Sequence, residues 1–210
     1  MPAIMSDSPN FLVMLQSHAS ARGDSCCHVL LDRVITYRRF WARIERASAR
    51  LQGEWGIAQG DTVAYIGQGH PDALVLYFAL LRIGARFLPL EQPDLNLPAV
   101  LSLHRPTFAL YDGARPEIDL ACRPLQALLA SWCAHDPDPV INDVSAANLW
   151  LPVGGKWRAF SLDELCLAMT AQPTTDQVVR AIFNDDLLCR TILPSLRLAL
   201  PLRFGQGQSA

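Results

Sequence analysis

The sequence has no run of one charge and no large excess of either sign. Among 210 residues, 18 are Lys or Arg and 20 are Asp or Glu, which gives a formal net charge of −2. Proteins that bind nucleic acids normally cluster Lys and Arg to neutralise phosphates. This composition therefore argues against a nucleic-acid partner.

The sequence also lacks the spacings that mark metal sites and secreted proteins. No two of its 6 cysteines stand at Cys-x-x-Cys spacing, and no histidine pair follows at zinc-finger spacing, so we expect no bound metal. The opening MPAIMSDSPNFLVML has no basic segment before its short apolar run, unlike a secretory signal. We therefore expect a cytoplasmic protein with reduced thiols. The cysteines are Cys26, Cys27, Cys122, Cys133, Cys166 and Cys189.

Long apolar runs are absent as well. The most apolar stretch, ALVLYFALLRIGARFLPL, contains Arg82 and Arg86 and falls short of the ~20 residues that span a membrane. No Gly-x-Ser-x-Gly motif is present, which removes one class of serine hydrolase. Hydrophobic residues nevertheless make up 50% of the chain and charged residues only 18%, so we expect a folded domain with a substantial core.

The first half of the chain alternates helix and strand patterns. Thr36 is placed to begin a helix with apolar residues at helical spacing, and Gly53 is placed to end it. Gly67 to Asp72, GQGHPD, lacks the third glycine of a dinucleotide loop and is expected to be a strand-to-helix turn. The alternation predicts an α/β fold, a layered and largely parallel sheet flanked by helices. The expected elements are a strand at 62–67, a helix at 71–84, a strand at 85–90, a helix at 97–104 and a strand at 107–112.

The second half is less regular, because prolines interrupt it between residues 113 and 143. Ser161 and Glu164 form a capping-box pattern that predicts a helix start. Further expected elements are a helix at 124–132, a strand at 148–153, a helix at 161–170, a helix beginning at Thr174 or Thr175, and an apolar segment up to Phe204. We expect three parts: an N-terminal segment at 1–30, an α/β domain at 31–170, and an apolar C-terminal extension with a polar tail at 171–210.

Between Val34 and Asp112, three segments follow one another in a familiar order: ITYRRF, GIAQGDTVAYI and ALLRIGARFLPLEQP. Together they resemble the N-terminal part of the adenylate-forming enzymes, which include acyl-CoA synthetases, luciferases and the adenylation domains of peptide synthetases. The resemblance implies that these segments build a scaffold and carry no catalytic residue.

The same resemblance implies that a phosphate-binding loop comes next, Thr-Ser-Gly-Thr-Thr-Gly-Lys-Pro-Lys-Gly in the family. Laid on this chain without gaps, that motif falls on residues 150–159. Gly155 and Lys156 match it, Gly154 adjoins them, and Arg158 keeps a positive charge, but every hydroxyl is missing. Phosphate oxygens need several convergent donors, and Pro152 has no N–H to offer. We therefore predict a vestigial nucleotide site at Gly154, Gly155, Lys156 and Arg158 that does not hold ATP.

No later motif of the family has a counterpart in the chain, and the leading hypothesis is a truncated, non-catalytic homologue. It would serve as a protein-binding subunit, scaffold or regulator beside an acyl-activating, polyketide or lipid biosynthetic pathway. Its partner would be another protein or a second copy, bound through exposed apolar surface, and it would need no cofactor. The alternative is one half of a split acyl-CoA synthetase, completed by another chain and using ATP and Mg²⁺.

Other polar groups have ordinary explanations. His70 and His104 lie near expected helix ends, where we favour a capping or solvent-facing role over that of a catalytic base. His28 follows Cys26 and Cys27, but neighbours on an extended chain point to opposite faces, which disfavours a nucleophile pair. The pair at 185–186 is expected to be a solvated loop or a helix start rather than a metal site.

Overall fold

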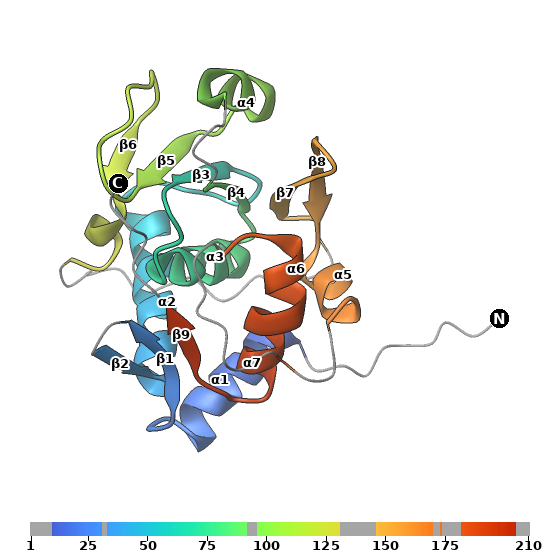
Figure 1. Ribbon diagram of the computed structural model, residues 1–210. Helices are drawn as coiled ribbons and strands as arrows, with labels where there is room; N and C mark the ends of the chain where they lie inside the picture. Colours follow the sequence, from blue (N-terminus) through green and yellow to red (C-terminus); the bar gives the residue numbers. More distant parts are fainter. Residues whose placement is uncertain are drawn as a thin grey trace.

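The computed structural model describes residues 10–30, 33–91, 96–130, 146–169, 173 and 182–204. Within these ranges the chain forms two β-sheets and their flanking helices (Figure 1). The helices are α1 (Phe11–Ala21), α2 (Tyr37–Gly53), α3 (Asp72–Ile83), α4 (Leu97–His104), α5 (Leu162–Leu167), α6 (Asp185–Leu187) and α7 (Leu193–Arg197), with a 3-10 turn η1 (Leu125–Leu128) and a π-helical turn η2 (Leu188–Ile192). The strands are β1 (Cys26–Leu30), β2 (Arg33–Thr36), β3 (Thr62–Ile66), β4 (Arg86–Leu90), β5 (Phe108–Tyr111), β6 (Cys122–Pro124), β7 (Leu149–Val153), β8 (Lys156–Phe160) and β9 (Leu202–Phe204).

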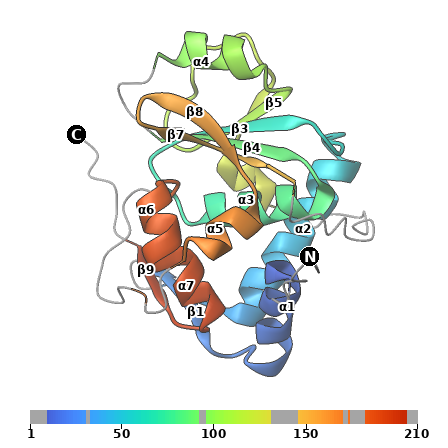
Figure 2. The same ribbon diagram turned by 90° about the vertical axis from the view of Figure 1, so that its right-hand side faces the viewer.

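The larger sheet has six strands in the order β6-β5-β3-β4-β7-β8 (Figure 1), and Figure 2 shows α4 on one side of it and α3 on the other. Every neighbouring pair is parallel except β7 and β8, which form an antiparallel hairpin at one edge. From β3 the chain returns through α3 to β4, and from β4 it crosses through α4 to β5 on the other side of β3. The predicted fold class, an α/β layer with a largely parallel sheet flanked by helices, is confirmed.

Local signals in the sequence set the helix boundaries. The Thr36 side chain accepts a hydrogen bond from the Arg39 N–H at 3.4 Å and caps α2. Helix α3 ends at Gly84, whose left-handed φ of 72° suits glycine. Ser161 and Glu164 form the reciprocal bonds of a capping box at the start of α5. These three predictions from the sequence are confirmed.

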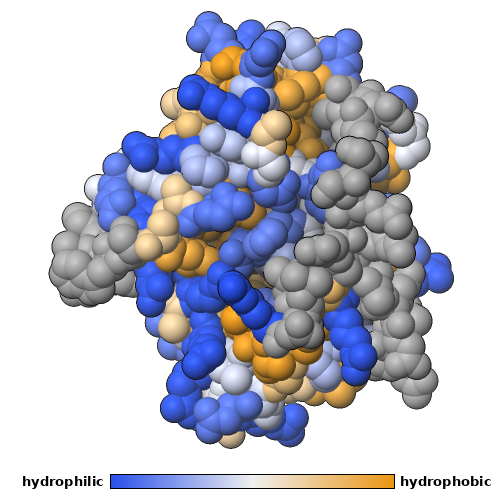
Figure 3. Space-filling view, turned by 60° about the vertical axis from the view of Figure 1, so that its left-hand side comes forward, coloured by the Kyte–Doolittle hydropathy of each residue, from blue (hydrophilic) through white to orange (hydrophobic). Residues whose placement is uncertain are grey.

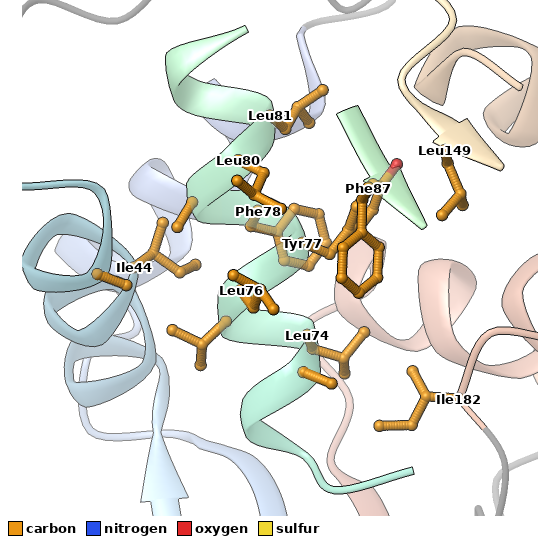
Figure 4. Packing of buried hydrophobic residues seen from close by; sticks show 14 of the residues in the cluster. Ile44, Leu74, Leu76, Tyr77, Phe78, Leu80, Leu81, Phe87, Leu149 and Ile182 are labelled. Carbon is orange, nitrogen blue, oxygen red and sulfur yellow. The ribbon is translucent and has the colours of Figure 1, made fainter. Parts of the chain in front are cut away.

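The main core surrounds α3, because all of its residues from Asp72 to Ile83 are buried. Figure 4 shows Tyr77 and Phe87 side by side between α3 and β4, with Leu149 and Ile182 close to them. The Phe183 ring completes this cluster, with its centroid 4.8 Å from that of Phe87 and 5.9 Å from that of Tyr77. Burying an aromatic or aliphatic side chain of this size contributes ~1.5–3 kcal/mol, which explains why α3 is apolar nearly all round.

The smaller sheet joins the two ends of the described chain. Its strand order is β2-β1-β9, and β9 lies parallel to β1 with His28 opposite Leu202. Helix α1 contributes Phe11 and Leu15 to the main core, and β9 contributes Phe204. Segments before residue 30 and after residue 170 thus pack on the same core as the α/β layer, and the expected division at those positions stays a prediction.

Two helices predicted in the second half were wrong in extent. In the described part of the helix expected at 124–132, Pro124 ends strand β6 and only the 3-10 turn η1 follows, because Pro124 is extended, with φ −64° and ψ 142°. Residues 131 and 132 lie outside the described residues. The helix from Ser161 ends at Leu167, where the Met169 N–H donates to the Cys166 carbonyl in a tighter turn. The helix expected from Thr174 or Thr175 lies outside the described residues, apart from Ile182 and Phe183, which are not helical. The pair at 185–186 does begin a helix, α6.

The two faces of the larger sheet are covered to different extents. The main core lies on the face that carries α3, whereas the opposite face has a cluster of only five buried residues between α4 and the sheet. Partly buried apolar side chains surround this smaller cluster, and Figure 3 shows hydrophobic side chains reaching the surface at the end of the molecule formed by α4, β5 and β6. The buried members are Ala64, Leu88, Leu90, Val100 and Ala109.

Candidate functional site

The glycine pair singled out in the sequence forms the turn of the β7–β8 hairpin. Val153 pairs with Lys156 directly across it, so Gly154 and Gly155 are the whole connection. Their φ angles are 57° and 77°, the left-handed values that a tight two-residue hairpin turn requires and that glycine adopts easily. Residues 150–153, onto which a gap-free alignment places the first part of a phosphate loop, belong to a strand of the sheet.

The four predicted site residues do not converge. Gly154, Gly155 and Lys156 lie together at the exposed tip of the hairpin, and Lys156 makes no ion pair with another described residue. Arg158 points instead toward α5, where its guanidinium lies 3.3 Å from Glu164 and over the Phe160 ring at 4.6 Å.

The charge of Arg158 therefore has a partner inside the protein. The Ser161 N–H, which donates to the Glu164 carboxylate at 2.9 Å, and the neighbouring Arg158 both lower the pKa of Glu164 below its ordinary value. Lys156 and Arg158 also alternate along an edge strand. Charged side chains at such positions are typical of edges that resist pairing with another chain.

A cavity of about 360 Å³ lies between β8, α5 and the segment that includes α6 and η2. Its two arginines each face a carboxylate, since Arg190 contacts Asp186 at 2.7 Å as Arg158 contacts Glu164. The Cys189 thiol, which is buried, donates to the Leu165 carbonyl at 3.7 Å. The lining thus contains two arginine–carboxylate pairs together with apolar side chains. It is made of Arg158, Phe160, Glu164, Leu165, Ala168, Asp186, Cys189 and Arg190.

A polar cluster that the sequence did not reveal closes the carboxyl ends of β3 and β5. The Tyr65 hydroxyl donates to the Asp112 carboxylate, which also accepts the Gln68 N–H at 3.0 Å, and the His70 N–H donates to the Tyr65 hydroxyl at 3.0 Å. Gly67 permits this approach, because a Cβ there would lie 2.4 Å from the Asp112 carboxylate.

In open α/β sheets, ligands bind where the connections from neighbouring strands leave in opposite directions, as they do at β3 and β5. At this point of the sheet the Asp112 carboxylate accepts the Gln68 N–H. The only signal in the sequence was an aspartate directly after the strand TFALY.

Glu91, directly after β4, ties the C-terminal segment to the sheet. Its Oε2 accepts the N–H groups of Ile182 and Phe183, both at 2.9 Å. Its Oε1 is buried and has no hydrogen-bond partner among the described residues. Burial, with a smaller contribution from nearby Asp112, raises the pKa of Glu91 to about 7, against the pull of the two N–H groups.

None of the histidines examined as bases or nucleophile partners is placed for that work. His70 Nδ1 accepts the Asp72 N–H at 3.2 Å at the start of α3, which is the predicted capping role. His104, in the last turn of α4, is partly buried and packs against two tryptophan rings. Burial, together with Arg43 and His70, lowers the pKa of His28 to about 3, and burial raises the pKa of the Cys27 thiol far above its usual range.

The described residues contain no cluster of three His, Cys, Asp or Glu side chains able to hold a metal ion. In the same part of the chain, no helix combines the length and the apolar character needed to cross a membrane.

Comparisons with known proteins agree with the fold. Residues 15–112 match the family described as AMP-binding enzyme. A 60-residue segment is 35% identical to the indoleacetate–CoA ligase of Aromatoleum aromaticum, covering 29% of this chain and 12% of that protein. A 75-residue segment is 35% identical to the carboxylic acid reductase of Mycobacterium tuberculosis, covering 35% of this chain and 6% of that protein.

Solved structures extend the likeness over nearly the whole chain. The N-terminal subdomain of NpsA from Klebsiella oxytoca has a TM-score of 0.77 at 19% identity, over 97% of this chain and 56% of that one. The o-succinylbenzoate CoA synthetase of Bacillus subtilis has a TM-score of 0.79 at 16% identity, over 96% of this chain and 45% of that one. The chain thus spans about half the length of these solved proteins and matches a small part of the two relatives above.

Proposed function

We propose that the chain is a non-catalytic relative of the AMP-binding enzymes, whose family model matches residues 15–112, and that it binds another protein chain and no nucleotide. It acts as a subunit, scaffold or regulator beside carboxylate activation, which is the context of the relatives named as CoA ligases and synthetases. A polyketide or lipid biosynthetic pathway fits the same context.

One observation carries the proposal: the β7–β8 connection is a turn of two glycines. Val153 and Lys156 already belong to the strand ladder, so the turn offers at most the N–H groups of Gly154 and Gly155 and no hydroxyl. Each hydrogen bond to a charged group contributes about 1.5–3 kcal/mol, and a triphosphate needs several of them at once. Lys156 beside such a turn can attract an anion, but the turn has too few hydrogen-bond donors to enclose a triphosphate.

The exposed lysine favours the second candidate, a domain that becomes catalytic when a separate chain supplies the remaining groups. Lys156 has no ion-pair partner among the described residues, so its charge is available to a phosphate held mainly by that other chain. On this candidate, ATP and Mg²⁺ bind only when the second chain is present.

Chemical labelling of Lys156 tests the proposal, because it is the only lysine in the chain. An acetylating ester will modify Lys156 and the α-amino group, and mass spectrometry of the peptides will give both rates, with the α-amino group as the internal reference. We expect millimolar Mg-ATP or pyrophosphate to leave the Lys156 rate unchanged. A selective, several-fold protection of Lys156 by nucleotide would overturn the proposal.

A further inference from the structure

Helix α2, which runs from the smaller sheet toward the larger one in Figure 1, carries more positive charge than the protein uses internally. It has five arginines and one acidic residue. Arg50 is buried and donates to two backbone carbonyls of η1 at 2.8 and 3.0 Å, and Arg43 contacts Asp72 at 2.7 Å. The acidic residue, Glu45, lies 3.6 Å from Arg82 of α3, so its charge is already paired. Two of the five arginines thus serve the fold.

The other three arginines, Arg38, Arg39 and Arg46, are exposed on the outer side of α2. The small Ala42, between Arg39 and Arg46, is exposed as well, and we call these four residues the α2 stripe. Arg39 and Arg46 make no ion pair with another described residue. The pair of Arg38 with Asp24 is 3.6 Å long and largely exposed, so it contributes little. Arg39 and Arg46 lie on the same side of the helix, two turns or ~10.5 Å apart along its axis.

Arg39 stands where a glutamate would stabilise the helix better. Its N–H donates to the Thr36 side chain that caps α2, so Arg39 is the third residue of the helix. In a capping box that position is Glu or Gln, as at Glu164 after Ser161 in α5. Positive charge in the first turn also opposes the helix dipole, and Arg38 adds to it. The stripe therefore does not stabilise α2, which indicates a contact outside the chain.

The surroundings of the α2 stripe select the kind of molecule that it contacts. The large apolar side chains of α2, which include Phe40, Trp41 and Ile44, are buried in the core. The stripe therefore lacks the bulky apolar groups with which interfacial helices enter a membrane. Its three arginines are also fewer than the phosphate contacts of a typical DNA-binding surface. Guanidinium groups pair with carboxylates through two parallel hydrogen bonds, so the matching surface is an acidic one on a protein.

We propose that the α2 stripe binds an acidic helix of a partner protein. Carboxylates seven residues apart on such a helix are separated by the same ~10.5 Å as Arg39 and Arg46. On an extended strand, side chains of one face repeat every ~6.8 Å, which does not match this distance. The small Ala42 lets the backbone of the partner helix approach between the two arginines. The inference rests on the proposed function, since it gives the chemistry of the protein chain that is bound.

Fluorescence anisotropy of a labelled probe peptide at low salt tests the inference. The probe is an alanine-rich helix of ~20 residues with glutamates at every seventh position, and its isomer has the same glutamates spread around the helix. We expect the full chain to bind the probe more tightly than the isomer, and the binding to weaken as salt screens the charges. Arg39→Gln combined with Arg46→Gln should raise the dissociation constant about fivefold or more. The matched control, Arg105→Gln combined with Arg115→Gln, changes two exposed arginines that make no ion pair with another described residue, and should bind as the wild type does.

Arg39→Glu separates binding from folding. It completes a capping box with Thr36, so its urea midpoint should rise above that of the wild type, while its binding of the probe should be lost. A lower midpoint would show that Arg39 serves the fold and would overturn the inference. Equal binding of probe and isomer by the wild type, no binding at millimolar probe, or an equal loss of affinity in the control variant would overturn it as well. Labelling of Lys156 does not involve α2, so failure of this inference and failure of the proposed function are recognisable separately.

Discussion

Replacing Glu91 by Gln should change how the stability of the fold depends on pH. In the wild type one carboxylate oxygen accepts the N–H groups of Ile182 and Phe183, and the other is buried without a hydrogen-bond partner among the described residues. Gln keeps an oxygen that can accept the same two N–H groups and carries no charge at any pH. The substitution therefore removes the titration and retains the tie between the C-terminal segment and β4.

The sign of the effect follows from the raised pKa. Burial raises the pKa of Glu91 from 4.5 to about 7 in the folded state. Between these two pH values the folded protein binds more protons than the unfolded chain. The stability that the protonated Glu91 contributes to the fold is therefore fully present below pH 4.5 and is lost as the pH rises through about 7. This difference in pKa between the folded and unfolded states corresponds to about 3 kcal/mol in the free energy of unfolding, and most of that change occurs between about pH 5 and about pH 8.

The assay is urea unfolding, followed by tryptophan fluorescence, at about pH 5 and about pH 8. We expect the free energy of unfolding of Glu91→Gln, relative to that of the wild type, to be about 2–3 kcal/mol higher at about pH 8 than at about pH 5. Glu117→Gln, which removes an exposed carboxylate, is the control and should run parallel to the wild type. If the wild type and Glu91→Gln differ in free energy of unfolding by the same amount at both pH values, burial does not raise the pKa of Glu91 and the reasoning is refuted.

Three further substitutions test the packing, the polar cluster and the capping, each by the free energy of urea unfolding at neutral pH. Phe87→Ala should cost about 3–5 kcal/mol, because it empties the centre of the aromatic cluster, and a loss below about 1 kcal/mol would show that the cluster is loosely packed. Gly67→Ala should cost about 1–3 kcal/mol, since the new Cβ would lie 2.4 Å from the Asp112 carboxylate, and an unchanged stability would contradict the close approach. Ser161→Ala should cost about 1 kcal/mol through the lost cap, and an unchanged stability would show that α5 needs no cap.

Strong local patterns made much of the fold predictable from the sequence. The helical spacing behind Thr36, the fully apolar α3 with Gly84 at its end, and the capping box at Ser161 each combine a periodic stretch with a chemical boundary. Such elements are specified by residues close together in sequence. The helix at 97–104 and the strands on either side of it were predicted for the same reason.

The hairpin was harder to predict, because nothing in the sequence fixed the length of the connection between its strands. A gap-free comparison treated residues 150–159 as one loop, whereas the pairing of Val153 with Lys156 reduces the loop to two glycines. Strand β8 was not predicted, because its alternation of Lys156, Trp157 and Arg158 places two charges on an edge strand. Local propensity does not distinguish such a segment from a charged loop.

The polar groups at the ends of β3, β4 and β5 depend on distant contacts. Asp112 meets Tyr65 from 47 positions away, and Glu91 holds Ile182 across 91 positions. Each residue alone reads as an ordinary polar group after a strand. Only the folded sheet shows that Asp112 accepts hydrogen bonds from Tyr65 and Gln68 and that Glu91 anchors the C-terminal segment.

The central claim is that the β7–β8 turn does not grip a nucleotide, and titration calorimetry of the purified chain with Mg-ATP, and separately with AMP, tests it most directly. The wild type, Lys156→Ala and Arg39→Ala, which removes an exposed charge on α2, should all give no binding heat up to millimolar nucleotide. Micromolar binding by the wild type and Arg39→Ala that is lost in Lys156→Ala would contradict the claim and make this chain a nucleotide-binding domain.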